Sequence, residues 1–145
     1  MSEFCLFLIL AAAAAASVFL LLALHFKRLR TPLSMDEMEG HEFEYYCADL
    51  LSMNGFRNVE VTRGSGDFGA DILAEKDGVT YAIQCKCYDG PVGVAAVQEV
   101  YAAKDFYDRM VGAVMTNRTF TAPAVTMARK LGILLWDRGL LKNLA

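Results

Sequence analysis

A hairpin signal in the middle of the chain constrains the fold more than any other feature of the sequence. Residues 70–76 and 79–87 are two β-like runs, and only the dipeptide Asp77-Gly78 separates them. A two-residue Asp-Gly connection is typical of two antiparallel strands that pair directly. The two runs are therefore predicted to be neighbours in one sheet, and the rest of the chain has to fold around them.

Three polar residues interrupt this otherwise apolar pair of strands. Asp71 lies at the start of the first strand, and Gln84 and Lys86 lie near the end of the second. Side chains alternate between the two faces of a strand, so Gln84 and Lys86 share one face. If Asp71 pairs near Gln84, the three polar groups converge. Because burying unpaired polar groups is costly, this convergence predicts a ligand or a metal.

The elements around the hairpin indicate an α/β layer fold with later helical crossovers. The pattern predicts helices over residues 35–54, 93–107 and 121–131, and strands over residues 57–62, 110–116 and 132–136. Ser34 and Glu37 fit a capping box at the start of the first helix. In the second helix, Val94, Val97, Tyr101 and Lys104 repeat at helical spacing.

The first 30 residues differ in composition from the rest of the chain. Residues 4–26 contain no Asp, Glu, Lys or Arg, and a helix of this length spans roughly 30 Å. The basic sequence KRLR follows directly, which favours a cytoplasmic domain and an N-terminus outside. The expectation is a single-pass transmembrane anchor with a basic flank over residues 1–30. A secretory signal peptide is the alternative, although the preceding segment MSE lacks the positive charge of such a peptide.

The charge of the remaining residues argues against a general polyanion-binding surface. The first 30 residues hold three of the chain's 14 Lys and Arg and one of its 17 Asp and Glu, so residues 31–145 have a formal net charge of −5. Phosphate groups repel such a protein unless local positive charge or a divalent cation offsets the repulsion. A nucleic-acid function therefore requires one of these features in the site.

The cysteines do not indicate a zinc site. Cys85 and Cys87 flank Lys86, and Cys47 lies in the first predicted helix, but the sequence has no second Cys or His pair at ligand spacing. In a cytoplasmic domain, reduced thiols with a structural role are the expectation.

The polar cluster suits a divalent ion of the Mg²⁺ type, either Mg²⁺ or Mn²⁺. Such ions prefer oxygen ligands and take only one or two carboxylates from a protein. Asp71, the side-chain oxygen of Gln84 and the backbone carbonyl of Cys85 can supply these ligands. Lys86 is then placed to orient or activate an attacking water and to stabilise charge on a phosphate. Asp67, in the preceding loop, is a further candidate ligand, with a role in the turn as the alternative.

Three segments of the sequence resemble the Mrr-type restriction endonuclease family, a branch of the PD-(D/E)xK nuclease superfamily. They are GHEFEYYCADLLSMNGFRNVEVTRGSGDFGADILAEKDG, YAIQCKCY and VGAVMTNRTFTAPAVTMARKLGILLWDR. No single segment identifies the family, but together the segments occur in the family's order over residues 40–141. The resemblance implies a restriction-endonuclease-like core with a central mixed sheet flanked by helices. It places an endonuclease domain at residues 40–145, after a linker and helix start at residues 31–39.

The resemblance also implies an activity and the residues that carry it. The activity is metal-dependent hydrolysis of DNA phosphodiester bonds, with Asp71, Gln84 and Lys86 as catalytic residues. The acidic residue of the first helix corresponds to Glu44, which could hold a water or a second metal. Gln84 departs from the Asp or Glu of the wider superfamily, and this change weakens anionic metal binding. A homodimer is implied because cutting both strands needs two active sites, and no small-molecule cofactor is expected.

Candidate DNA contacts lie in three places outside the catalytic cluster. They are Arg63, Ser65 and Gly66 in the glycine-rich loop, Gln98 on the second domain helix, and Asn117 and Arg118 after a buried strand. Gln98 and its neighbour Glu99 face the catalytic edge if the helix docks as in related nucleases. The alternative for all of these residues is a structural or surface role. The alternative for the whole protein is an inactive membrane-tethered module that binds DNA or a partner on the same fold.

Overall fold

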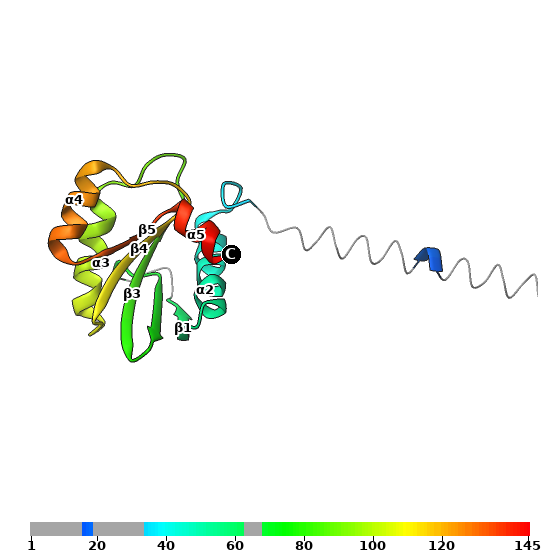
Figure 1. Ribbon diagram of the computed structural model, residues 1–145, viewed down its shortest axis with the longest axis horizontal. Coiled ribbons are helices and arrows are strands. Elements are labelled where there is room, and N and C mark those ends of the chain that lie inside the picture. Colours follow the sequence, from blue (N-terminus) through cyan, green and yellow to red (C-terminus); the bar gives the residue numbers. More distant parts are fainter. Residues whose placement is uncertain (1–15, 19–33, 63–67) are drawn as a thin grey trace, which may run out of the picture. The chain divides into compact units, whose positions relative to one another are not determined.

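A five-stranded mixed sheet forms the centre of the protein in the computed structural model, which describes residues 16–18, 34–62 and 68–145 (Figure 1). The spatial order of the strands is β1-β2-β3-β4-β5. The pairs β1–β2 and β2–β3 are antiparallel, and the pairs β3–β4 and β4–β5 are parallel. The strands are β1 (Arg57–Val61), β2 (Ile72–Lys76), β3 (Val79–Lys86), β4 (Val111–Thr116) and β5 (Leu134–Trp136). This arrangement confirms the predicted α/β core.

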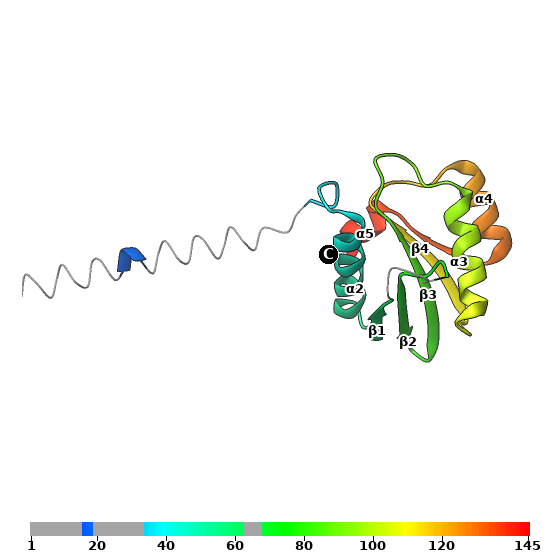
Figure 2. The ribbon, with the colours of Figure 1, turned by 180° about the vertical axis from the view of Figure 1, so that it is seen from behind.

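Helices cover both faces of the sheet, as Figures 1 and 2 show. They are α2 (Gly40–Met53), α3 (Val94–Phe106), α4 (Ala122–Leu131) and α5 (Arg138–Leu144). Helices α3 and α4 connect the parallel strands, and because such crossovers are right-handed, both helices lie on the same face. Helices α2 and α5 cover the other face. One apolar core therefore forms on each side of the sheet.

The predicted hairpin between β2 and β3 is present in the expected register. Asp77 and Gly78 both have positive φ angles, of 52° and 79°, as a tight turn between twisted strands requires. Ile72 pairs with Ile83, so the preceding Asp71 lies opposite Gln84. The side chains of Ile83 and Cys85 pack in the core below α2. Gln84 and Lys86 therefore share the opposite face, as predicted.

The first domain helix starts later than predicted. Ser34 and Glu37 close a turn, in which Glu37 N donates to Ser34 O at 2.8 Å. The helix begins at Gly40, where Glu39 and Glu42 form the capping box instead. Met35 is buried in the core on the α2 side, so the segment before the helix packs against the domain.

Helix α3 buries a face that includes Val97 but not Tyr101 of the residues noted at helical spacing. Tyr101 is exposed, and the buried residues are Ala96, Val97, Val100 and Ala103. Small side chains are preferred here because α3 lies close to the sheet: a Cβ added at Gly112 of β4 would lie 3.4 Å from the backbone oxygen of Val100. Helix α5 was not predicted. Asp137 caps it by accepting a hydrogen bond from Leu140 N at 3.0 Å.

Several predictions concern residues outside the described part of the chain. These are the membrane anchor over residues 4–26, of which only residues 16–18 are described, its basic flank at 27–30, and the loop residues Arg63, Ser65, Gly66 and Asp67. Within residues 16–18, 34–62 and 68–145, no helix is both long enough and apolar enough to cross a membrane.

Candidate active site

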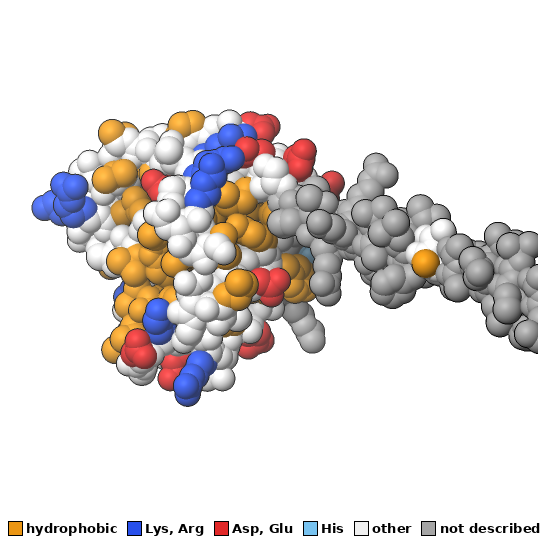
Figure 3. Space-filling view, turned by 45° about the vertical axis from the view of Figure 1, so that its right-hand side comes forward, with side chains coloured by type: hydrophobic (Ala, Val, Ile, Leu, Met, Phe, Trp, Pro, Cys, Tyr) orange, Lys and Arg blue, Asp and Glu red, His pale blue; other side chains and the backbone are white. Residues whose placement is uncertain are grey.

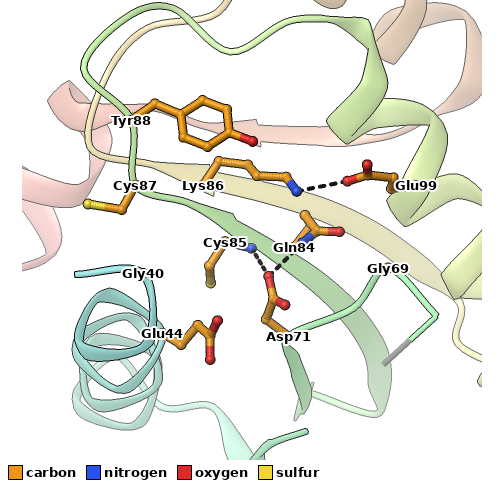
Figure 4. A pocket seen from close by; sticks show the side chains of 10 residues that line it. All are labelled: Gly40, Glu44, Gly69, Asp71, Gln84, Cys85, Lys86, Cys87, Tyr88 and Glu99. Carbon is orange, nitrogen blue, oxygen red and sulfur yellow. Dashed lines mark hydrogen bonds and ion pairs between the residues drawn. The ribbon is translucent and has the colours of Figure 1, made fainter. Parts of the chain in front are cut away.

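The predicted catalytic residues lie around one cavity of about 490 Å³ (Figure 4). The cavity lies where the chain enters β2 and leaves β3, so the hairpin places both of its polar ends there. Helix α2 borders it on one side and helix α3 on the other. The lining residues are Gly40, Glu44, Gly69, Asp71, Gln84, Cys85, Lys86, Cys87, Tyr88 and Glu99.

Asp71 is held in place by three hydrogen bonds to β3. Its backbone N–H donates to Ile83 O at 2.8 Å, which extends the strand pairing by one residue. Its Oδ2 accepts from Gln84 Nε2 at 2.7 Å and from the backbone N–H of Cys85 at 2.6 Å. The side chain is only 6% exposed. Hydrogen bonds to a carboxylate are short and strong, so Asp71 has a fixed orientation at the cavity wall.

Gln84 has an unused acceptor beside this carboxylate. The residue is 5% exposed, and its Nε2 is taken by Asp71. Among the described residues, its buried Oε1 has no hydrogen-bond partner. Buried polar atoms almost always have partners, so an exception calls for an explanation such as an ion or a water. An oxygen donor next to a carboxylate is the combination that a hard divalent cation takes.

No cluster of three or more His, Cys, Asp or Glu side chains that could hold a metal is present in the described part of the chain. The proposed ligand set for a metal at this cavity therefore combines Asp71 with amide and backbone oxygens, and Glu44 is a further carboxylate in the lining. Gln84 Oε1 and the backbone carbonyl of Cys85 are the candidate oxygen ligands in the cavity lining. The donor set consequently fits an oxygen-seeking ion and does not fit zinc.

Lys86 forms an ion pair across the cavity. Its Nζ lies 2.8 Å from Oε2 of Glu99 on α3. Burial tends to lower the pKa of Lys86, but the hydrogen bond and the charge of Glu99, with smaller contributions from Tyr88 and Asp71, raise the pKa above its usual value. Lys86 is therefore a stable cation in this state of the protein.

Glu44 reaches the same cavity from helix α2. Its Oε2 lies 2.7 Å from Nδ1 of His41, one turn earlier on the helix. In Figure 4 the side chain of Glu44 extends from α2 toward Asp71. The structure thus places Glu44 at the same cavity as Asp71, Gln84 and Lys86.

Of the cysteines next to the site, Cys47 and Cys85 are buried and Cys87 is partly buried. Cys47, Cys85 and Cys87 are all free. A hydrogen bond with Cys47, and then burial, raise the pKa of Cys85 well above its usual value. A neutral thiol in an apolar core is unreactive, which agrees with a structural role.

The DNA contacts predicted outside the loop have different surroundings. Gln98 is exposed on α3 and does not line the cavity. Asn117 is buried, and it holds the backbone of Tyr88 through bonds to both its N–H and its carbonyl. Arg118 Nε also donates to Tyr88 O, at 2.8 Å, and its Nη1 lies 3.2 Å from Asp36. A DNA contact by Asn117 would require its internal hydrogen bonds to break.

Two residues that line the cavity, Glu99 and Gly69, were not assigned a role in the site from the sequence. Glu99 was noted only as facing this edge, and its ion pair with Lys86 depends on how α3 docks on the sheet, so no local pattern reveals it. Gly69 has a φ angle of +89°, and a Cβ there would lie 2.8 Å from the backbone oxygen of Glu99. The glycine-rich loop was a signal for such a close approach, but it did not identify the partner.

Three solved structures resemble the fold. A protein of unknown function, AF1548, is 27% identical with a TM-score of 0.55, and the match covers 65% of this chain and 55% of that one. The DNA modification-dependent restriction endonuclease AspBHI is 21% identical, with a TM-score of 0.58 and coverage of 70% and 30%. The MspJI restriction endonuclease, solved in complex with a 27-mer oligonucleotide, is 17% identical, with a TM-score of 0.57 and coverage of 83% and 29%.

These similarities support the fold and define the part of the larger proteins to which the chain corresponds. The chain spans about half of AF1548 and less than a third of AspBHI and of MspJI. No curated protein matches it. Residues 35–145, which include every residue that lines the cavity, match the catalytic-domain family Mrr_cat, described as restriction endonuclease. The chain therefore belongs to the Mrr_cat restriction endonuclease family.

Proposed function

We propose that this chain is a metal-dependent endonuclease that hydrolyses DNA phosphodiester bonds at the cavity between α2 and α3. The observation that carries the proposal is the Oε1 of Gln84, which is buried beside the carboxylate of Asp71 and has no hydrogen-bond partner in the described ranges 16–18, 34–62 and 68–145. An inert protein gains nothing from leaving this acceptor unused, because the desolvation cost is not recovered. Family membership supplies the reaction class.

Asp71, Gln84 Oε1 and the backbone carbonyl of Cys85 are the proposed ligands of Mg²⁺ or Mn²⁺. When bound, such an ion polarises a phosphoryl oxygen and lowers the pKa of a coordinated water. It also offsets the repulsion between DNA and a domain of net negative charge. On the face in Figure 3, Lys and Arg side chains are interspersed with acidic and hydrophobic ones.

Lys86 and Glu44 complete the proposed machinery. The ammonium group of Lys86 orients the attacking water and offsets negative charge as it develops on the phosphate. Its raised pKa favours this cationic role over proton abstraction. Glu44 lies on the α2 side of the cavity, where its carboxylate can hold a water or a second ion.

DNA is the proposed partner, supported by the family and by the oligonucleotide complex of the similar MspJI. The proposed DNA contacts are Arg63, Ser65, Gly66, Gln98, Asn117 and Arg118. Arg118 has the most favourable position of those described, because it is partly exposed and adjoins Tyr88 at the cavity rim. A homodimer is proposed because two sites are needed to cut both strands.

We also propose that residues 4–26 tether the nuclease to a membrane, with the domain on the cytoplasmic side. The proposal rests on the absence of charged residues in this segment and on the three basic residues that follow it. Extraction of membranes with carbonate tests it: an anchored chain stays in the pellet, whereas release into the supernatant would contradict the tether. Mass spectrometry of the mature N-terminus tests the signal-peptide alternative.

A plasmid-nicking assay tests the nuclease proposal. The full chain is incubated with supercoiled DNA in Mg²⁺, in Mn²⁺ and in EDTA, and cleavage is expected with either metal and not with EDTA. Asp71→Ala and Lys86→Ala should each reduce the rate by roughly 10²- to 10⁴-fold. The control is Asp105→Asn, which changes a carboxylate of α3 that does not line the cavity. DNA binding without cleavage in any metal would favour the inactive binding module.

A further inference from the structure

The ion pair between Lys86 and Glu99 joins the end of β3 to helix α3. The two charged atoms lie 2.8 Å apart, and the side chain of Lys86 is 18% exposed whereas that of Glu99 is 46% exposed. Figure 4 shows both side chains extended toward each other at the cavity rim. We propose that Glu99 is a positioning residue, which holds the ammonium group of Lys86 in one orientation at the reaction site. This inference rests on the proposed nuclease function and deepens it.

A lysine needs such a partner if its charge is to act at a defined point. Its side chain is a flexible four-carbon stem that ends in a compact charge, so nothing within the residue fixes the direction of the ammonium group. Rates depend steeply on placement, and a misplacement of about 1 Å can cost about 10²-fold. Asp71 and Gln84 are fixed by their mutual hydrogen bond. The bond to Glu99 supplies the corresponding constraint for Lys86.

Glu99 is itself part of the framework that carries Asp71. Gly69, two residues before Asp71, approaches the backbone of Glu99 so closely that a Cβ would lie 2.8 Å from its carbonyl oxygen. Phe68 stacks on Phe106 at the end of α3, with ring centroids 4.0 Å apart. The segment before β2 and helix α3 therefore contact each other at two points. These contacts consequently fix the position of Asp71 relative to Glu99, which pairs with Lys86.

A competing role for Glu99 makes the opposite prediction. If Glu99 served as a latch, it would occupy Lys86 until a DNA phosphate displaced it, and its removal would strengthen substrate binding. If Glu99 positions Lys86, its removal lowers kcat and leaves KM nearly unchanged, because the substrate still binds but meets a poorly placed cation.

The first experiment measures the order of Lys86 directly and does not depend on activity. The full chain is prepared as wild type, Glu99→Ala, Glu99→Gln and Asp105→Asn, and ¹³C relaxation reports the motion of the Lys86 ε-methylene. Glu99→Ala should increase this motion, whereas Glu99→Gln should keep part of the order because its amide oxygen still accepts a hydrogen bond. Asp105 pairs with Lys104 on the same helix at 2.8 Å, so its variant is the matched control. Unchanged order in Glu99→Ala would overturn the proposal.

The second experiment measures cleavage of a labelled DNA duplex in Mg²⁺ by the same variants. Glu99→Ala should lower kcat by about 10- to 100-fold with KM within about twofold, and Glu99→Gln should recover part of the loss. In a Lys86→Ala background, Glu99→Ala should add almost nothing, because its partner is already absent. A lower KM with an equal or higher kcat would establish the latch and overturn positioning. If the wild type cleaves in no metal, the nuclease proposal fails, and the relaxation experiment still decides the role of Glu99.

Discussion

Two buried amide side chains lie at the same edge of the sheet, and they differ in how their polar atoms are satisfied. Gln84 is near the end of β3 and is 5% exposed, and Asn117 directly follows β4 and is 2% exposed. Asn117 Oδ1 accepts from Tyr88 N at 2.9 Å, and its Nδ2 donates to Tyr88 O at 3.1 Å and to Met35 O at 3.3 Å. Gln84 donates to Asp71, but its Oε1 has no partner among the described residues.

The difference teaches that burial of a polar group does not by itself identify a functional residue. The hydrogen-bonding capacity of Asn117 is used by the fold, because the residue joins the segment before α2 to the loop after β3. The capacity of Gln84 is only partly used, and the unused atom lies beside a carboxylate. A buried polar atom that lacks a hydrogen-bond partner and lies beside a charged group is therefore a better indication of a ligand site than a polar residue in a strand.

The largest expected effect is on the cleavage rate of Gln84→Ala. The substitution removes a proposed metal ligand and the hydrogen bond that orients Asp71, so the rate should fall by at least about 10²-fold, since even outer partners of metal ligands contribute 10- to 100-fold. Initial nicking rates in Mg²⁺ measure this. Asn117→Ala, assayed at a temperature where it is folded, should lose much less activity. Equal losses in the two variants would remove the functional distinction between the two amides.

The next prediction replaces Gln84 by glutamate and measures metal binding through stability. In EDTA, Gln84→Glu should melt at a lower temperature than wild type, because a second carboxylate would lie against Asp71. Mg²⁺ or Mn²⁺ should then raise its Tm by more than that of wild type, because a ligand that binds the folded state stabilises it by about 2.7 kcal/mol at 100 times its Kd. Equal metal-induced shifts in the two proteins would mean that residue 84 does not contact the ion.

A third prediction concerns the stability that Asn117 provides. Asn117→Ala removes the acceptor of the Tyr88 N–H and one of the two donors to the Tyr88 carbonyl, which keeps Arg118 Nε, so the free energy of unfolding should fall by about 1–3 kcal/mol. Urea denaturation monitored by circular dichroism measures this change. Gln98→Ala removes an exposed amide from α3 and should alter stability by no more than about 0.5 kcal/mol. If Asn117→Ala is as stable as this control, the network around Tyr88 is not a structural element.

The sequence predicts the local parts of this comparison well. Asp77 and Gly78 determine the hairpin, and the period of two along β3 then places Gln84 and Lys86 on one face, opposite Asp71. The convergence of these residues follows from turn chemistry and alternation alone. The roles of the converging residues do not follow from the same argument, and they come from the resemblance to a nuclease family.

The parts that were not predicted depend on contacts between distant segments. The bond of Glu99 to Lys86 depends on how α3 docks on the sheet, and this docking is set by small residues at Ala96 and Gly112. The start of α2 was predicted too early because Met35 is buried in the core, a tertiary effect that overrides the local capping signal. The hydrogen bonds of Asn117 were not predicted for the same reason: its partners lie 29 and 82 positions away in sequence.

The smallest expected effect is pH-dependent and concerns Asp36, which lies beside Asn117. Its Oδ1 lies 2.6 Å from Arg138 Nη1 and 3.2 Å from Arg118 Nη1. The hydrogen bond from Arg138, and then the charges of Arg118 and Arg138, hold the pKa of Asp36 below its ordinary value of 3.8, although burial opposes this shift. Because the pKa is lower in the folded state, the ionised carboxylate stabilises the fold above its ordinary pKa. This contribution is lost as pH falls through the folded-state pKa.

Wild type should therefore melt slightly above Asp36→Asn at pH 7, and the difference should become smaller as the pH falls below the ordinary carboxyl pKa of 3.8. Thermal melts of both proteins across this range measure the effect. A difference that persists at the lowest pH would mean that the carboxylate acts through its shape and not its charge. The melts are then repeated with Asn117→Ala in the wild-type and Asp36→Asn backgrounds. If Asn117→Ala lowers the Tm equally in both backgrounds, the amide of Asn117 holds Tyr88 at the rim of the cavity without help from the ion pairs of Asp36.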